Sequence, residues 1–179
     1  MHITGDLNLN IQFFNEVLEW LRNKIVLIIL FVILSSKSTF MAKNIVQRIT
    51  FKNTKPEKVY ALYANVKLHS TIAGSSVKVS TKPGAPFSAW DGYITGNTIH
   101  AIKDKLFTQT WRGSDWTSES PDSFFSIMIE PRGKDVVMHA IHANVPDEHA
   151  GHLAKGWHDH YWNLWKQHLA GKQIKRPGM

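Results

Sequence analysis

The chain has 179 residues, no cysteine and a formal net charge of +7 at pH 7. This length suits one domain of ordinary size with a short extension. The lack of cysteine excludes a disulfide framework, a thiolate metal site and a cysteine nucleophile. The basic excess lies in residues 41–179, where lysines and arginines are spread out. We therefore predict a solvated basic surface and no binding of nucleic acid.

The first forty residues differ in composition from the rest. They contain Ile25–Leu34, a run of ten apolar residues that follows Arg22 and Lys24 and precedes small residues typical of a cleavage site. A helix of ten residues spans only about half of a bilayer core, so the run is too short for an ordinary transmembrane helix. It matches the middle of a secretory signal, although the stretch before it is longer and more mixed than a signal start.

Three interpretations of residues 1–40 stay open. They are a start codon wrongly assigned upstream of Met41, a signal-like or membrane-associated segment at residues 20–36, and a helix that packs on the domain. A start at Met41 predicts a cytoplasmic protein without a targeting segment. Cleavage near Ser36, or use of residues 20–36 as an anchor, predicts an exported or membrane-associated protein instead.

From Met41 the pattern is that of a mixed α+β domain. Alternating apolar residues predict a first strand that ends near Phe51. Two short helices are predicted next, the first beginning near Pro56 and the second covering residues 67–73. Turn residues then separate six further strand-like runs, at 76–80, 85–90, 93–102, 106–112, 123–130 and 135–144. The short connections between these runs predict an antiparallel meander.

The last long segment, Pro146–Leu169, predicts one long helix. Its apolar and aromatic residues recur at steps of three and four and so lie on one stripe: Ala150, Leu153, Ala154, Trp157, Tyr161, Leu164, Trp165 and Leu169. Such a stripe needs a broad apolar surface, which the strands supply. The predicted domain, residues 41–171, is therefore a curved antiparallel sheet of about seven strands wrapped on a long C-terminal helix, and a basic tail follows at 172–179.

Three segments carry a resemblance to a known family: FSAWDGYITGNTI at 87–99, TQTWRGSDW at 108–116 and NVPDEHAGHLAKGWHDHYW at 144–162. They resemble the C-terminal domain of the activator of heat-shock protein 90 ATPase (AHSA-type) family. The order of elements is similar to that of the helix-grip fold of the START-like (SRPBCC) superfamily. The resemblance covers about residues 45–170 and implies an apolar cavity between the helix and the concave face of the sheet.

The same resemblance leaves the function open. The two-domain co-chaperones of the AHSA-type family have a separate N-terminal domain that does much of the chaperone binding, and residues 1–44 are too short to form it. Stimulation of a chaperone ATPase is therefore not implied, since a fold does not determine a function. Two classes remain: a non-enzymatic domain that binds a hydrophobic or amphipathic small molecule, and an interaction module that docks on a chaperone or client protein.

Aromatic and methionine side chains are numerous for one domain and supply the cavity candidates. With one arginine, these candidates are Phe87, Trp90, Tyr93, Phe107, Trp111, Arg112, Trp116, Met128, Met138, Trp157, Tyr161 and Trp165. A close-packed core is the alternative role for the same side chains. In the run 106–112, alternation puts Phe107, Gln109 and Trp111 on one face but does not tell which face is inside.

Arg112 is the best polar candidate for the cavity. Its alternative role is an ion pair with Asp115 or Glu130 that pins the long loop after it. The chain has ten histidines, but they do not follow a metal-ligand spacing, and the sequence has no phosphate-binding loop and no nucleophile elbow. We therefore predict no catalytic residue, no metal site and no cofactor.

Overall fold

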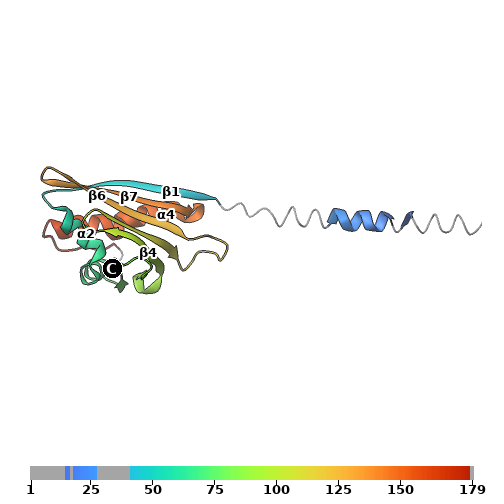
Figure 1. Cartoon of the computed structure of the whole chain (residues 1–179), viewed down its shortest axis with the longest axis horizontal. Helices are drawn as coiled ribbons and strands as arrows, with labels where there is room; N and C mark the ends of the chain where they lie inside the picture. Colours follow the sequence, from blue (N-terminus) through green and yellow to red (C-terminus); the bar gives the residue numbers. More distant parts are fainter. Residues whose placement is uncertain (1–14, 17, 28–40, 178–179) are drawn as a thin grey trace, which may run out of the picture. The chain divides into compact units, whose positions relative to one another are not determined.

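The computed structural model describes residues 15–16, 18–27 and 41–177 (Figure 1). The chain separates into two compact units, residues 1–40 and 41–179. In the first unit the described residues 18–27 are helical, while most of the apolar run Ile25–Leu34 lies outside the described residues. Within the described ranges, every helix falls short of the length and apolar character that crossing a membrane requires.

The second unit contains an antiparallel sheet of seven strands in the order β1-β7-β6-β5-β4-β3-β2. The strands are β1 (Ala42–Phe51), β2 (Val77–Lys78), β3 (Pro86–Ala89), β4 (Ile94–Ile102), β5 (Leu106–Gly113), β6 (Ser123–Arg132) and β7 (Asp135–Pro146). Strands that follow one another from β2 to β7 pair as a meander, and β1 closes the far edge beside β7. The predicted α+β class and the sheet of about seven strands are confirmed.

The predicted helices also form. The two short helices after the first strand are α2 (Pro56–Ala64) and α3 (Val66–Ala73). The predicted long helix consists of α4 (Asp147–Trp157), the π-helical segment η2 (His158–Trp162) and α5 (Asn163–Leu169). The backbone keeps right-handed helical angles at both junctions, so the three run on as one helix against one face of the sheet (Figure 1).

The π-helical turn changes which side chains the helix buries. In η2 the N–H of Asn163 bonds to the carbonyl of His158, five residues earlier. Residues five apart therefore lie one above the other, and the indole rings of Trp157 and Trp162 stack with centroids 5.4 Å apart. Trp162 is fully buried although the regular helical spacing places it beside the predicted stripe.

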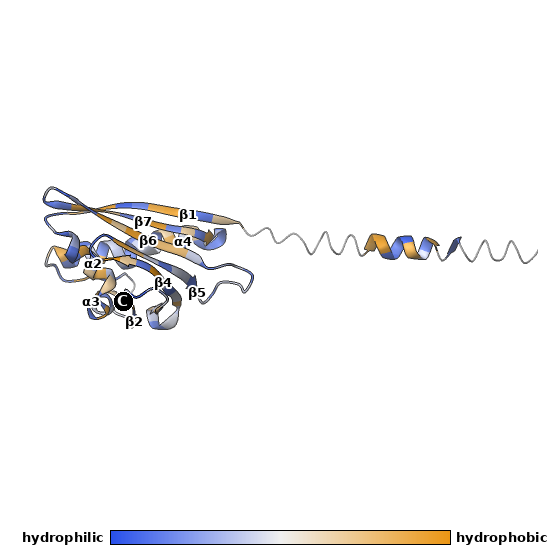
Figure 2. Ribbon diagram, in the orientation of Figure 1, coloured by the Kyte–Doolittle hydropathy of each residue, from blue (hydrophilic) through white to orange (hydrophobic). Residues whose placement is uncertain are grey.

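Alternation along the strands decides the inner face of the sheet. Figure 2 shows polar and apolar residues alternating along β1, where Ile45, Ile49 and Phe51 are buried. On β5, Phe107, Gln109 and Trp111 are buried, which settles the face that the sequence left open. These inner faces pack against α2, α3 and the long helix and form one continuous core.

The basic tail folds back onto the domain. The guanidinium group of Arg176 donates hydrogen bonds to the carbonyls of Thr71 (2.6 Å) and Ile72 (3.2 Å), near the end of α3. Ile174 packs against the core. A cation at the C-terminal end of a helix is favourably placed, since the helix dipole is negative there.

Gly96 on β4 is predicted to be essential for the pairing with β5. A Cβ atom at this position would lie 2.0 Å from the backbone carbonyl oxygen of Thr110, a distance that requires the backbone to move. Gly96→Ala should therefore lower the free energy of unfolding by about 2 kcal/mol or more. In urea denaturation, the control Gly151→Ala on α4, which has open space around it, should be neutral or stabilising. Equal stability of the two variants would contradict this account.

Candidate functional site

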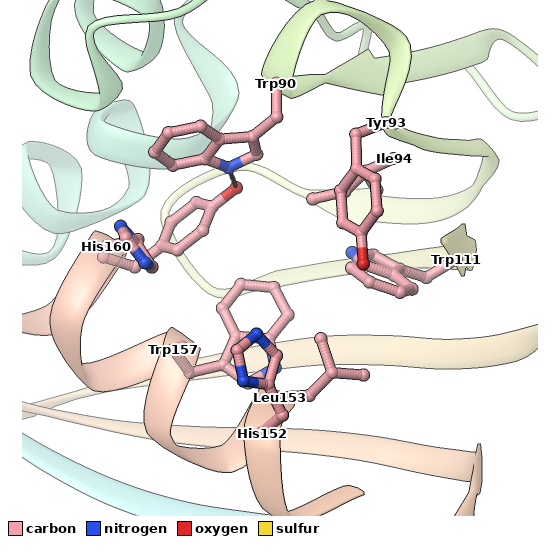
Figure 3. A pocket seen from close by; sticks show the side chains of 10 residues that line it. Trp90, Tyr93, Ile94, Trp111, His152, Leu153, Trp157 and His160 are labelled. Atoms are coloured by element: carbon pink, nitrogen blue, oxygen red, sulfur yellow. Dashed lines mark hydrogen bonds between the residues drawn. The ribbon is translucent and has the colours of Figure 1, made fainter. Parts of the chain in front are cut away.

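A pocket of about 320 Å³ lies between the long helix and the sheet end formed by β4 and β5 (Figure 3). Its walls are mainly apolar and aromatic, with two histidines. The lining residues are Trp90, Tyr93, Ile94, Trp111, His152, Leu153, Gly156, Trp157, His160 and Tyr161. We call this space the helix–sheet pocket.

The helix supplies six of the ten lining residues through its spacing. His152, Gly156 and His160 recur every four residues, and so do Leu153, Trp157 and Tyr161, so both rows face the same side. Gly156 has no side chain, and no atom lies within 4 Å of the position that its Cβ would take. The open space of the pocket therefore borders the helix backbone directly at this residue.

Trp90 closes the pocket on the side opposite the helix. Its indole N–H donates a hydrogen bond of 3.0 Å to the Tyr161 hydroxyl, and its ring meets the His160 ring edge-on at 5.2 Å (Figure 3). Burial raises the pKa of Tyr161, so the hydroxyl that Trp90 binds stays protonated. A bond between the turn that follows β3 and the long helix thus spans one side of the helix–sheet pocket.

A short 3-10 turn, η1 (Trp90–Gly92), holds Trp90 in this position. Trp90 and Asp91 both have a φ of 55°, a left-handed conformation that costs a residue with a side chain roughly 1–2 kcal/mol. The Asp91 carboxylate accepts hydrogen bonds from the Ser75 hydroxyl (3.0 Å) and the Ser76 backbone N–H (3.2 Å). These bonds also keep the pKa of Asp91 below its usual value, and they offset part of the strain in the turn.

A chain of directed hydrogen bonds lies behind Trp157. The indole N–H of Trp157 can only donate, so Nδ1 of His142 accepts at 3.2 Å and the ring carries its proton on Nε2. Nε2 then donates to the Ser123 hydroxyl at 2.7 Å, and that hydroxyl donates to the Trp111 carbonyl at 2.7 Å. Ser123 and His142 thus have the spacing of a nucleophile and its base. A base would have to accept the proton of the Ser123 hydroxyl, whereas His142 donates its own proton to that hydroxyl.

Two buried histidines are held neutral. Burial lowers the pKa of His142 from 6.5 to about 3. Burial also lowers the pKa of His69 to about 4, and its Nδ1 donates to the Tyr63 carbonyl at 2.9 Å. Both imidazoles are core groups, and neither lines the helix–sheet pocket.

The structure separates the twelve predicted cavity candidates into groups. Five of them line the helix–sheet pocket: Trp90, Tyr93, Trp111, Trp157 and Tyr161. Five are core residues that do not line it: Phe87, Phe107, Trp116, Met138 and Trp165. Met128 is exposed on the outer face of β6. The alternative of a packed core therefore applies to about half of the candidates.

Arg112 does not reach the pocket and pins the loop after β5. It donates to the carbonyls of Thr117 (2.5 Å) and Ser120 (2.7 Å) and pairs with Asp122 at 3.1 Å. The predicted loop-pinning role is therefore found, but both predicted partners are wrong. Glu130 pairs with Arg132 instead, because alternate residues of β6 point to the same outer face.

Five lining residues are not among the predicted candidates. Ile94, Leu153 and Gly156 do not belong to the aromatic and methionine side chains from which those candidates come. His152 and His160 stand eight residues apart, with Gly156 midway, and this spacing could have placed them on the face of the predicted stripe. Within the described part of the chain, no three His, Asp or Glu side chains are grouped so that they could hold a metal ion.

The comparisons with known proteins identify the family of the domain. The family model "Activator of Hsp90 ATPase homolog 1-like protein" matches residues 53–170, which include both short helices, β2 to β7 and the long helix. The chain belongs to this family. The helix–sheet pocket is formed entirely by residues of the matched segment. No curated protein matches the chain.

Solved structures show the same fold at low identity. An HSP90 activator from Plasmodium falciparum is 18% identical with a TM-score of 0.60, over 73% of this chain and 99% of that one. The Aha1 dimer from Colwellia psychrerythraea is 16% identical with a TM-score of 0.63, over 73% and 99%. CalU16 from Micromonospora echinospora is 15% identical with a TM-score of 0.63, over 74% and 77%. The AHSA-type START-like fold that the sequence predicted is thereby confirmed.

The neutral histidines predict a loss of stability in mild acid. The unfolded chain protonates these imidazoles below about pH 6.5, whereas folded His69 and His142 stay neutral down to about pH 4 and 3. The unfolded state therefore binds more protons, and the free energy of unfolding should fall by about 1.4 kcal/mol per pH unit for each residue as the pH drops from 6.5 to 4.

Urea denaturation at several pH values measures this dependence. His142→Gln should lower stability at pH 7.5 and should also reduce the slope between pH 6.5 and 4, since one of the two groups is gone. His100→Gln, at an exposed residue of β4, is the control for the loss of a histidine as such. If His142→Gln leaves the slope unchanged, His142 is not the neutral core group described above.

Proposed function

We propose that the domain binds a small apolar molecule in the helix–sheet pocket and does so without catalysis. The observation that carries this proposal is the open space beside Gly156 in a wall made mainly of aromatic and aliphatic side chains. Small-molecule sites are mostly apolar pockets in which a few polar groups fix the orientation of the ligand. The helix–sheet pocket, of about 320 Å³ and with two histidines in its wall, has this character.

The size and the walls of the pocket favour a flat ring system. Its volume of about 320 Å³ is roughly twice the ~150 Å³ of a cavity that binds one benzene molecule, so two fused rings are a suitable size. The rings of Trp90, Trp111 and Trp157 border this space (Figure 3). Aromatic rings prefer offset stacking or edge-to-face contacts with other rings, which favours an aromatic ligand over a flexible chain.

The polar groups around the pocket support a binding role. His142 holds its Nε2 proton toward Ser123, so this imidazole cannot take a proton from that hydroxyl. The carboxylate of Asp115, near the rim, accepts a hydrogen bond of 2.9 Å from Tyr93. General acid–base catalysis needs a titratable group within reach of the reacting atom. His142 and Asp115 are committed to structural bonds, which leaves the imidazoles of His152 and His160 as the titratable rings of the pocket wall.

A second candidate function is docking on an Hsp90-type chaperone, which the family membership suggests. The outer face of the sheet exposes Phe124 (46%) and Met128 (42%) on β6 and Val46 (70%) on β1, and β7 lies between these two strands. Exposed apolar groups on one face are candidates for an interaction surface. The basic surface of the domain would favour an acidic partner.

The first candidate predicts that filling the pocket abolishes binding. Gly156→Leu places a side chain in the open space, whereas Gly151→Leu places the same side chain on the same helix, outside the pocket and in open surroundings. With 2-acetylnaphthalene as probe, calorimetric titration should show binding to the wild type and to Gly151→Leu. Gly156→Leu should bind about tenfold more weakly or not at all, which corresponds to ~1.4 kcal/mol or more.

Both substitutions replace glycine in a helix and should stabilise α4 by similar amounts, so thermal unfolding serves as the folding control. Equal affinity of the two variants would place the probe elsewhere on the protein. Absence of binding to the wild type, by this probe and by a set of other two-ring compounds, would remove the support for a ligand-binding function.

The second candidate predicts that Phe124→Ser weakens capture of purified Hsp90 in a pull-down assay, while stability changes by less than about 1 kcal/mol. Val66→Ser is the matched control, because Val66 is an exposed apolar residue (45%) on α3 rather than on the sheet. Equal capture by the wild type and both variants would exclude the outer face of the sheet as the docking surface.

A further inference from the structure

Trp111 differs from the other two indoles of the helix–sheet pocket. The N–H of Trp90 donates to Tyr161 and the N–H of Trp157 donates to His142. The N–H of Trp111 has no hydrogen-bond partner in the described part of the chain, although the residue is only 1% exposed. In Figure 3 the nitrogen of Trp111 lies at the end of the ring nearest the middle of the pocket.

An unpaired buried N–H is costly. Leaving a buried donor without an acceptor costs about 1–3 kcal/mol, so such groups are rare unless a ligand or a water satisfies them. The neighbouring inward residue of β5, Gln109, is also fully buried, but its amide group faces the buried hydroxyl of Tyr63 and it does not line the pocket. The unpaired donor that borders the pocket is therefore the N–H of Trp111.

The carbonyl and hydroxyl groups nearby do not meet this need. The backbone carbonyl of Trp111 itself accepts from Ser123, and the Tyr161 hydroxyl accepts from Trp90. The ten lining residues include no Asp or Glu, so a cationic ligand would find no counter-charge in the pocket. The group that completes the site is therefore an acceptor brought in from outside.

We propose that the ligand is a flat molecule of about two fused aromatic rings that carries one oxygen acceptor, and that the indole N–H of Trp111 donates a hydrogen bond to this oxygen. The inference rests on the proposed binding function and adds the chemical class and the orientation of the ligand. A ligand with a carbonyl or phenolic oxygen suits the site. Its rings would lie against the aromatic walls, and its oxygen would meet the single unpaired donor among the lining indoles.

Two matched probes test the proposal. 2-Acetylnaphthalene carries a ketone oxygen, and 2-isopropenylnaphthalene has nearly the same shape with a CH₂ group in its place. The alkene is the more apolar of the two and gains more from leaving water. The two dissociation constants are therefore compared as a ratio, first in the wild type and then in Trp111→Phe. Phenylalanine keeps an aromatic ring and removes the N–H. The preference for the ketone should fall about three- to tenfold, as expected for one net hydrogen bond.

A direct readout uses the full-length wild type and needs the variant only to assign one resonance. The seven tryptophans give indole N–H resonances in a proton–nitrogen NMR spectrum, and the resonance missing from Trp111→Phe identifies Trp111. It should move downfield with the ketone and much less with the alkene. Thermal unfolding of Trp111→Phe shows whether the variant is folded.

The outcomes separate the two claims. If neither probe binds and the other two-ring compounds also fail to bind, the binding function and this inference are both overturned. If both bind, Gly156→Leu blocks both, and the Trp111 resonance responds equally to ketone and alkene, the binding function stands and the role of Trp111 is overturned. A water molecule that satisfies Trp111 permanently would give that second result.

Discussion

The hydrogen bond from Trp157 to His142 joins the long helix to the sheet, and much of the structure depends on it. It orients the Trp157 ring, which stacks on Phe125 at 4.1 Å on one side and on Trp162 at 5.4 Å on the other. It also fixes the His142 tautomer and thereby the direction of the bonds through Ser123 to β5. Because charging His142 would put a proton against the Trp157 N–H, the same bond ties the packing of the helix to a neutral imidazole.

The π-helical turn explains how one helix can both fill the core and border a pocket. In a regular α-helix, the large residues of the stripe lie along one line. The π-helical segment η2 adds a residue to the turn and so brings Trp162 into the core next to Trp157. Gln47 on β1 accepts from the Trp162 indole and donates to the Ala154 carbonyl at 2.8 Å, so β1 holds the helix on both sides of Trp157. With the core filled there, the helix face at Gly156 is left free to border open space.

The elements of the fold were predictable because each depends on local periodicity. Alternation identified the strands, and steps of three and four identified the helix stripe that includes Trp157 and Tyr161. The π-helical turn was not predictable, since its bonds span five residues and no residue type marks it. The left-handed angles of Trp90 and Asp91 were equally hidden, because the bonds from Ser75 and Ser76 that offset part of the strain come from sixteen and fifteen residues before Asp91.

Only part of the candidate site was predictable, because local periodicity does not determine where space remains between side chains. Aromatic content pointed to Trp90, Trp111 and Tyr161, but core and pocket residues have the same composition and differ only in whether space remains beside them. That space depends on the absence of a side chain at Gly156 and on a strained turn at Trp90, neither of which is a periodic feature. The shape of the helix–sheet pocket therefore depends on long-range contacts. Relatives that share the fold at low identity need not share a pocket of this form.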